Sequence, residues 1–211
     1  MKRFTVISLF PEIVVAYAGE SILKRAAEKK FLAVDAVQLR DFAVDKHRHA
    51  DDKPFGGGPG MVLMVEPIDR ALKSVLGAKK KKARVILTSA RGSIFTQADA
   101  RRLAKYDHVV FLCGRYEGVD ERVAEHLIDE ELSIGPYVLT GGELPALVMT
   151  DAIARQIPGV LGKGESLEET HGSFPQYTRP EKYKKWKVPP VLMSGDHKKI
   201  QEWRDKKKAG A

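Results

Sequence analysis

The segment from Ser133 to Pro145 carries the clearest chemical signal in the sequence. Glycines stand on both sides of a short apolar strand, Tyr137 to Leu139, and the pair Gly141-Gly142 then opens a helix. Such a chain exposes main-chain donors and acceptors around a pocket. A ligand with a purine base, a ribose and an amino-acid tail needs those hydrogen bonds, apolar walls and room for close approach. The alternative, a β-turn followed by a helix cap, does not explain so many glycines beside Tyr137 and Leu139.

A second segment, Cys113-Gly-Arg-Tyr-Glu-Gly-Val-Asp120, directly follows an apolar run that reads as a strand. This places Gly114 to Gly118 at the carboxyl end of a strand, where open α/β sheets form ligand sites. The charged residues of this region fit a ligand site and a surface ion-pair cluster about equally well. They are Arg115, Glu117, Asp120 and Arg122.

The loop Phe55-Gly-Gly-Gly-Pro-Gly60 offers backbone amides that can approach a phosphate or a flat base closely, although its glycines also suit a plain tight turn. No Gly-x4-Gly-Lys-Ser/Thr occurs and no Gly-x-Gly-x-x-Gly follows a strand, so nucleoside triphosphate and Rossmann dinucleotide binding lack support. For the residues from Lys46 to Asp52, we expect cationic contacts to a phosphate backbone rather than metal ligation, because no second cluster at helical spacing accompanies them.

Two further residues can take part in proton transfer or charge stabilisation. Arg155 lies near the end of the helix that Glu143 opens, and Glu165 follows ten residues later in a polar, glycine-rich linker. A carboxylate on a mobile segment can close over a substrate and act as a base. Taken alone, a residue of either kind is more often an ordinary exposed charge.

The elements that position these residues alternate between β-branched apolar runs and helical patterns, which predicts an α/β fold with a mostly parallel sheet and flanking helices. Predicted strands are Phe4 to Leu9, Ala33 to Leu39, Val62 to Val65, Arg84 to Ser89 and His108 to Cys113. Predicted helices are Pro11 to Lys29, Pro67 to Leu76, Thr96 to Lys105 with Thr96 as N-cap, Asp120 to Leu127, Glu143 to Gln156, and Lys198 to Lys208 with Asp196 as cap.

Two stretches interrupt this pattern. Residues Lys46 to Gly60 are polar and then glycine-rich, so we expect a long loop between two strands. Residues Pro158 to Pro180 read as a linker. We therefore predict a main domain over residues 1–160, a flexible active-site linker over 161–174 and a small helical C-terminal region over 175–211.

Composition limits the class of protein. The 211 residues are 43% hydrophobic and 30% charged, enough for one globular core and a small appendage. The apolar start meets Pro11 too early for a signal peptide, and no run of eighteen apolar residues occurs, so we expect neither secretion nor a membrane span. The single cysteine, Cys113, rules out an intramolecular disulfide and a multi-cysteine zinc site, and fits a reducing cytoplasm.

The chain is basic, and its charge is uneven. A net charge of +8 and a pI near 9.5 favour a polyanionic partner without identifying one. The run Lys79 to Lys82 fits a solvated loop before a strand, whereas further lysines and arginines gather after Pro180.

Together these segments resemble the bacterial tRNA (guanine-N1) methyltransferase family over nearly the whole chain. The resemblance is carried by Ile7-Ser-Leu-Phe-Pro11, Arg40-Asp-Phe42, His47-Arg48, Asp51-Asp-Lys-Pro-Phe-Gly-Gly-Gly-Pro-Gly-Met61, Cys113-Gly-Arg-Tyr-Glu-Gly118, Asp120-Glu-Arg122, Ser133-Ile-Gly135, Tyr137-Val-Leu139, Gly141-Gly-Glu-Leu-Pro145, Ile157-Pro-Gly-Val-Leu-Gly162, Tyr177-Thr-Arg-Pro180, Val188-Pro-Pro-Val-Leu192 and Ser194-Gly195. The resemblance implies a deep trefoil knot, S-adenosylmethionine as cofactor, and a homodimer that builds each site from both subunits. The substrate it implies is the guanosine immediately 3′ of the tRNA anticodon.

The resemblance also implies a role for particular residues. Arg155 would stabilise charge on guanine O6, and Glu165 would be the base that removes the N1 proton. Cofactor binding would fall to Gly114, Glu117, Ile134, Gly135, Pro136, Tyr137, Val138, Leu139, Gly141 and Gly142. Substrate binding would fall to Arg48, Gly57, Gly58 and Pro59. The family is also thought to use magnesium, for which the sequence offers no recognisable ligand set.

Three departures from the family pattern bear on function. Glu165 replaces an aspartate in a linker of reduced length, and Ala90 stands where a cofactor-lining proline is common. The chain also ends soon after Glu202-Trp-Arg204, so we expect a shortened tRNA-binding region. The alternatives are a related knotted methyltransferase that acts on another RNA and a basic RNA-binding protein without catalysis.

Overall fold

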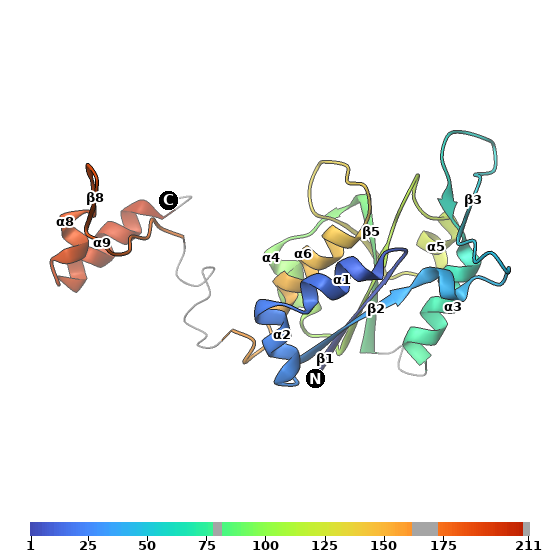
Figure 1. Ribbon diagram of the computed structural model, residues 1–211, viewed down its shortest axis with the longest axis horizontal. Helices are drawn as coiled ribbons and strands as arrows, with labels where there is room; N and C mark the ends of the chain where they lie inside the picture. The colour runs from blue at the N-terminus through green and yellow to red at the C-terminus, as the bar shows by residue number, and fades with distance from the viewer. Residues whose placement is uncertain (78–81, 162–172, 209–211) are drawn as a thin grey trace. The chain divides into compact units, whose positions relative to one another are not determined.

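A computed structural model describes residues 1–77, 82–161 and 173–208. The chain divides into two compact units, Met1–Leu161 and Gly162–Ala211. The first unit contains a five-stranded sheet with helices on both faces (Figure 1). Among the described residues, no helix is both long enough and apolar enough to cross a membrane.

All neighbouring strands of the sheet run parallel, as the alternating pattern predicted, in the order β2-β1-β6-β5-β7. The strands are β1 (Lys2–Ser8), β2 (Leu32–Gln38), β5 (Ala83–Ile94), β6 (His108–Cys113) and β7 (Glu130–Ser133). The central strand β6 shows why both faces are covered. Val109 and Phe111 pack in one buried cluster and Val110 and Leu112 in the other, because successive side chains point to opposite faces.

The helices form two layers around this sheet. One layer consists of α1 (Pro11–Ala18), α2 (Ser21–Glu28), α4 (Gln97–Leu103) and α6 (Glu143–Ala154), and the other of the 3-10 helix η1 (Leu39–Phe42), α3 (Val65–Leu76) and α5 (Glu121–His126). The predicted cap of α4 is confirmed: Thr96 Oγ1 accepts a hydrogen bond from Asp99 N, and the Asp99 carboxylate accepts one from Thr96 N.

The second unit is small. Its described elements are the hairpin strands β8 (Lys182–Tyr183) and β9 (Trp186–Lys187), and the helices α8 (Pro190–Met193) and α9 (His197–Lys207). Asp196 caps α9 as predicted, because its side chain accepts a hydrogen bond from Lys199 N.

Three predicted elements differ from the structure. The single helix predicted over Pro11 to Lys29 is two helices, which separate at Gly19-Glu20. The strand predicted over Val62 to Val65 is β4 (Val62–Leu63), which pairs antiparallel with β3 (Asp51–Asp52) outside the main sheet. Val65 instead begins α3.

The third difference concerns the glycine-rich segment. Residues Tyr137 to Leu139 form no strand, whereas the preceding residues Glu130–Ser133 form the edge strand β7. β7 is short and charged at its start, so it lacks the apolar run by which the other strands of the sheet are recognised.

Candidate functional site

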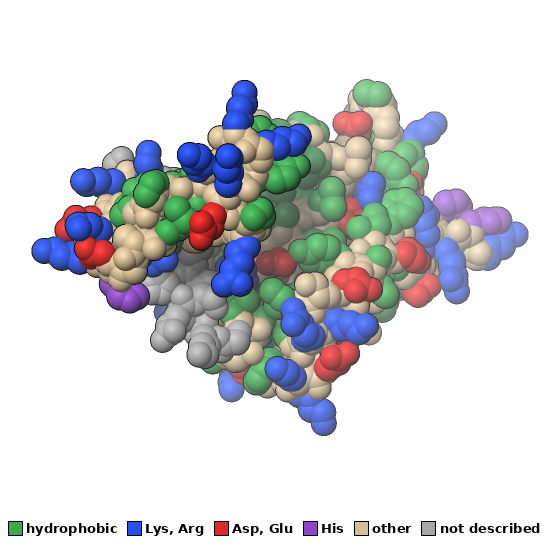
Figure 2. Space-filling view, turned by 60° about the vertical axis from the view of Figure 1, so that its left-hand side comes forward, with side chains coloured by type: hydrophobic (Ala, Val, Ile, Leu, Met, Phe, Trp, Pro, Cys, Tyr) green, Lys and Arg blue, Asp and Glu red, His purple; other side chains and the backbone are tan. Residues whose placement is uncertain are grey.

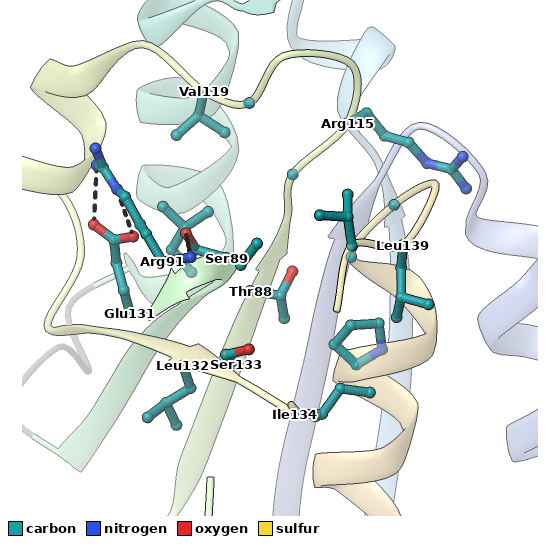
Figure 3. A pocket seen from close by; sticks show the side chains of 18 of the residues that line it. Thr88, Ser89, Arg91, Arg115, Val119, Glu131, Leu132, Ser133, Ile134 and Leu139 are labelled. Atoms are coloured by element: carbon teal, nitrogen blue, oxygen red, sulfur yellow. Dashed lines mark hydrogen bonds and ion pairs between the residues drawn. The ribbon is translucent and has the colours of Figure 1, made fainter. Parts of the chain in front are cut away.

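A pocket of about 470 Å³ lies at the carboxyl ends of β5, β6 and β7. Its walls come from three segments that are far apart in the sequence: the end of β5, the loop after β6, and the chain between β7 and α6 (Figure 3). The carboxyl edge of a parallel sheet is where open α/β proteins bind ligands, and the volume suits a nucleoside-sized molecule.

An irregularity in β5 opens one wall of this pocket. The register between β5 and β7 shifts between Thr88 and Ser93, so residues 89–92 leave the ladder, and Ser89, Ala90 and Arg91 line the pocket instead. Irregularities of this kind commonly re-aim a strand beside a functional site.

Arg91 holds the irregular segment in place. Its Nη2 lies 2.6 Å from a carboxylate oxygen of Glu121, and its Nε lies 3.1 Å from one of Glu131 (Figure 3). Partial burial favours the neutral acid of Glu131, but hydrogen bonds from Arg91 and Ser89 lower its pKa. Glu131 therefore carries a negative charge near neutral pH.

Gly142 allows the segment after β7 to pack directly against β6. A Cβ on Gly142 would lie 2.0 Å from Thr88 Oγ1, 2.8 Å from Cys113 Cα and 2.9 Å from Gly114 N. Gly142 N also donates a hydrogen bond to Gly114 O at 2.9 Å. Two of these contacts are with backbone atoms, which cannot rotate away as a side chain can. Only glycine therefore fits at this position without displacing β6.

A buried ion pair fastens the same junction. Glu143 is only 1% exposed, and its carboxylate accepts a hydrogen bond from Arg115 Nε at 3.1 Å and another from Ser8 Oγ. Its Oε2 lies 2.8 Å from Arg115 Nη2, close enough for an ion pair but without the angle of a hydrogen bond. Arg115 Nη1 also donates to Thr140 O at 3.1 Å. One guanidinium thus joins the loop after β6 to the start of α6.

The pair also affects the neighbouring cysteine. Complete burial raises the pKa of the Cys113 thiol, and the negative charge of Glu143 raises it further. Cys113 is therefore an unreactive thiol beneath the pocket rather than a nucleophile.

The structure brings together most of the residues predicted to bind a cofactor. Eight of them line the pocket: Gly114, Glu117, Ile134, Tyr137, Val138, Leu139, Gly141 and Gly142. Gly135 and Pro136 are not among its lining residues, and Gly135 is buried beneath the Tyr137 ring.

Three of the residues predicted for substrate binding, Gly57, Gly58 and Pro59, lie on the loop between β3 and β4, and Arg48 lies just before β3. Gly57 and Gly58 have positive φ and open space around them, and Arg48 forms an ion pair with Asp41 at 3.0 Å. None of the four lines the pocket, but the end of the loop reaches its rim, where Glu117 N donates a hydrogen bond to Met61 O.

Of the two residues predicted to be catalytic, the structure describes Arg155 alone, and Arg155 does not line this pocket. Arg155 is the C-cap of α6, outside the pocket lining, and its guanidinium has no hydrogen bond or ion pair with any described residue. Glu165 lies outside the described residues, so its predicted role stays a prediction.

Sequence reasoning did not decide whether the charged residues after β6 form a ligand site or a surface cluster, and the structure shows that the two arginines among them form separate ion pairs. Arg122 pairs with its near neighbour Asp120 at 2.6 Å, whereas Arg115 reaches across to the buried Glu143 at 2.8 Å. Only the first pair is a local surface interaction. Across the face shown in Figure 2, lysine and arginine side chains are spread widely, so net charge alone does not locate the site.

Sequence reasoning named only Ala90 of the β5 wall, as the position where the family pattern has a cofactor-lining proline. Thr88 and Ser89 end the predicted strand Arg84 to Ser89, and Arg91 follows it just as Gly114 follows β6. The parallel-sheet argument applied to both strand ends, but these three residues were not predicted to line the site. The Arg115–Glu143 pair had no comparable signal, because 28 positions separate its partners.

Fold and pocket define a class of protein: an open parallel α/β protein with a ligand site of glycine-bounded main chain at its carboxyl edge. Comparison with known proteins narrows this class. The family model described as tRNA (guanine-1)-methyltransferase TrmD matches residues 1–210.

Similar proteins agree with that match. The chain is 49% identical over 207 residues to the tRNA (guanine-N(1)-)-methyltransferase of Ruminiclostridium cellulolyticum, covering 96% of this chain and 89% of that protein. It is 49% identical over 207 residues to the protein of that name from Staphylococcus haemolyticus, covering 96% and 84%. For Pseudoalteromonas atlantica the identity is 47% over 214 residues, covering 99% and 81%. The chain belongs to the tRNA (guanine-1)-methyltransferase family, and the predicted family and enzyme class are confirmed.

The close packing at Gly142 leads to a test with a matched control. In Gly142→Ala the added methyl group must displace β6 backbone, so we expect a loss of about 1–3 kcal/mol in the free energy of unfolding. In Gly114→Ala the methyl group meets only Thr88 O at 3.4 Å, and stability should change little. Urea denaturation of both variants measures this difference, and equal stability of the two would contradict the packing argument.

Proposed function

We propose that the pocket at β5, β6 and β7 binds S-adenosylmethionine, and that the chain transfers its methyl group to N1 of the guanosine immediately 3′ of the tRNA anticodon. The observation that carries this proposal is the pocket of about 470 Å³ built from glycine-bounded main chain, in a chain of this family. With tRNA as the partner, the proposal places the activity in the cytoplasm.

The lining residues fit the proposed cofactor. Ile134 and the residues from Tyr137 to Thr140 line the pocket, where their main chain can offer donors and acceptors for an adenine, while Leu87 and Leu139 supply apolar walls. The Glu117 carboxylate is exposed at the rim and is a suitable partner for the ammonium of the methionine tail. When bound, the sulfonium supplies an electrophilic methyl group.

Guanine N1 carries a proton and becomes nucleophilic only when that proton leaves. We assign its removal to Glu165 and the stabilisation of the charge that then develops on O6 to Arg155. In this proposal residues 161–174 form the active-site linker and residues 175–211 the tRNA-binding region.

The position of Arg155 supports a site shared between two subunits. Gly142 at the start of α6 lines the pocket, and the 12 residues of that helix place Arg155 roughly 18 Å further on. An arginine side chain does not span that distance, so in a dimer Arg155 would serve the partner's pocket.

The outer surface of the same helix supports a dimer as well. Leu144 and Val148, one turn apart on α6, are 56% and 49% exposed, and Val15 on the neighbouring α1 is 62% exposed. A helix that is apolar on its outer face as well as its inner face favours burial against a second copy.

The packing at Gly142 supports the proposed trefoil knot. The chain leaves the edge strand β7, returns across the ends of β5 and β6, and fits Gly142 against the backbone of Cys113 before α6 begins. A segment threaded through a loop of its own chain needs such close backbone contacts.

The proposed mechanism assigns no role to magnesium. Among the described residues, no group of three His, Cys, Asp or Glu side chains is arranged to hold a metal ion.

The predicted substrate loop, with Arg48, Gly57, Gly58 and Pro59, presents open main chain and a cation, and we assign it to the RNA next to the target guanosine.

Methylation of tRNA transcripts tests the reaction itself. A transcript with guanosine immediately 3′ of the anticodon should accept labelled methyl groups at N1, and replacing that guanosine by adenosine should lower the rate by more than about 100-fold. Mass spectrometry of the digested RNA locates the methyl group. Equal methylation of both transcripts would point to another position, and no methylation with any tRNA would remove the proposed function.

A mixing experiment tests the shared site. Arg155→Ala and Leu139→Glu should each be inactive, the first through the lost cation and the second through a charge placed in the pocket. Random exchange of subunits makes half of the dimers mixed. Each mixed dimer has one intact site of its two, in which the pocket of the Arg155→Ala chain meets the intact Arg155 of the other chain, so the mixture should recover about a quarter of the wild-type rate.

The matched control is Arg155→Ala mixed with the double variant Arg155→Ala, Leu139→Glu, which should stay inactive. Native mass spectrometry verifies that subunits have exchanged. Exchange without recovered activity would mean that each chain supplies its own Arg155.

A further inference from the structure

The β8–β9 hairpin, residues 182–187, has an arrangement that folding alone does not explain. Its register places Tyr183 opposite Trp186, with ring centroids 5.8 Å apart, and Lys182 opposite Lys187. Since side chains alternate along a strand, the aromatic pair occupies one face of the hairpin and the two lysines the other. Lys184 and Lys185 form the turn between them.

Both faces are unfavourable for an isolated hairpin in water. Tyr183 and Trp186 are 56% and 61% exposed, so most of the aromatic surface is not used in packing. Like charges directly opposite each other destabilise a strand pair, and a lone two-stranded hairpin is marginal even without them. An arrangement that folding does not favour points to a binding role.

The hairpin lysines also have no carboxylate partner among the residues that the structure describes. In the same unit Lys199 pairs with Asp196 at 3.2 Å and Lys208 with Asp205 at 2.7 Å, which uses two of the acidic side chains on or beside α9. Lys184 instead lies 5.5 Å above the Tyr183 ring. The four ammonium groups of the hairpin are therefore available to an anion.

The surrounding unit concentrates the charge of the chain. From Ser173 to Lys208 there are eleven Lys and Arg against four Asp and Glu, an excess of seven in a chain whose net charge is +8. A field of this sign attracts a polyanion to the unit before any specific contact forms.

We propose that the β8–β9 hairpin binds an unpaired nucleotide of the tRNA, with the base stacked on the Tyr183–Trp186 face and the adjoining phosphates on the lysines. The identity of the RNA rests on the proposed function. Flat exposed rings beside cations are the means by which proteins hold single-stranded nucleic acid, and a base inside a duplex does not offer its face. The hairpin thus selects loop nucleotides rather than a helical stem.

Tryptophan fluorescence of the full chain tests this inference. Trp186 and Trp203 are the only two tryptophans, so Trp203→Phe leaves Trp186 as the single reporter. Unmodified tRNA transcript should quench its emission. Trp186→Ala should weaken tRNA binding by roughly 5- to 100-fold, whereas Trp186→Phe, which keeps a stacking ring, should stay within about twofold of wild type.

The lysines have a separate readout. Lys185→Gln should reduce the slope of log affinity against log salt by about 0.7, the value for one phosphate contact with a single strand. Lys206→Gln, an exposed lysine on α9, serves as the charge-matched control and should change the slope less. If the emission of Trp203 in Trp186→Ala matches that of Trp203 in the wild-type chain, the second unit stays folded in this variant.

Two results would overturn the inference. The first is an unchanged tRNA affinity in Trp186→Ala. The second is that Trp186→Ala loses as much affinity for a blunt RNA duplex without unpaired bases as for tRNA, because the hairpin would then not select unpaired nucleotides. Cofactor binding by calorimetry and methyl transfer by the wild-type chain are measured alongside. If these are normal while Trp186→Ala binds tRNA fully, the hairpin proposal fails and the proposed function stands.

Discussion

The contact between Gly142 and the end of β6 is the constraint on which the site depends. Two backbones approach there until a single methyl group would overlap Cys113 and Gly114, and the buried Arg115–Glu143 pair fixes the contact from the side. Because both segments are held, the main chain between β7 and α6 keeps its place in the wall of the pocket. A binding surface made of main chain needs such support, since main chain cannot change rotamer to suit a ligand.

This constraint also separates the parts of the proposed reaction. The α6 helix begins at the pocket and carries Arg155 away from it, so the residue proposed for charge stabilisation and the pocket proposed for the methyl donor lie at opposite ends of one helix. This separation is the reason for our proposal that two subunits share each site. The second unit is strongly basic and adds a surface suited to a polyanion.

Sequence patterns predicted the layered α/β architecture and located most of the pocket, because long apolar strands and glycine pairs leave a local signature. They did not predict β7, which is short and begins with two glutamates, nor the break between α1 and α2. The Arg115–Glu143 pair and the Arg91 bridge to Glu121 and Glu131 join residues far apart in the chain. Only the folded arrangement of strands brings them together, so no local pattern contains them.

Hydrogen exchange with and without S-adenosylmethionine tests the central claim most directly. Amides that exchange in the free protein are expected to become protected on binding in Gly114 to Gly118 and Ile134 to Gly142, the segments that meet at the Gly142 contact. Peptides from the β3–β4 loop and the second unit are expected to remain unchanged. Protection confined to those other regions, or no protection anywhere at saturating donor, would contradict a main-chain pocket at this edge of the sheet.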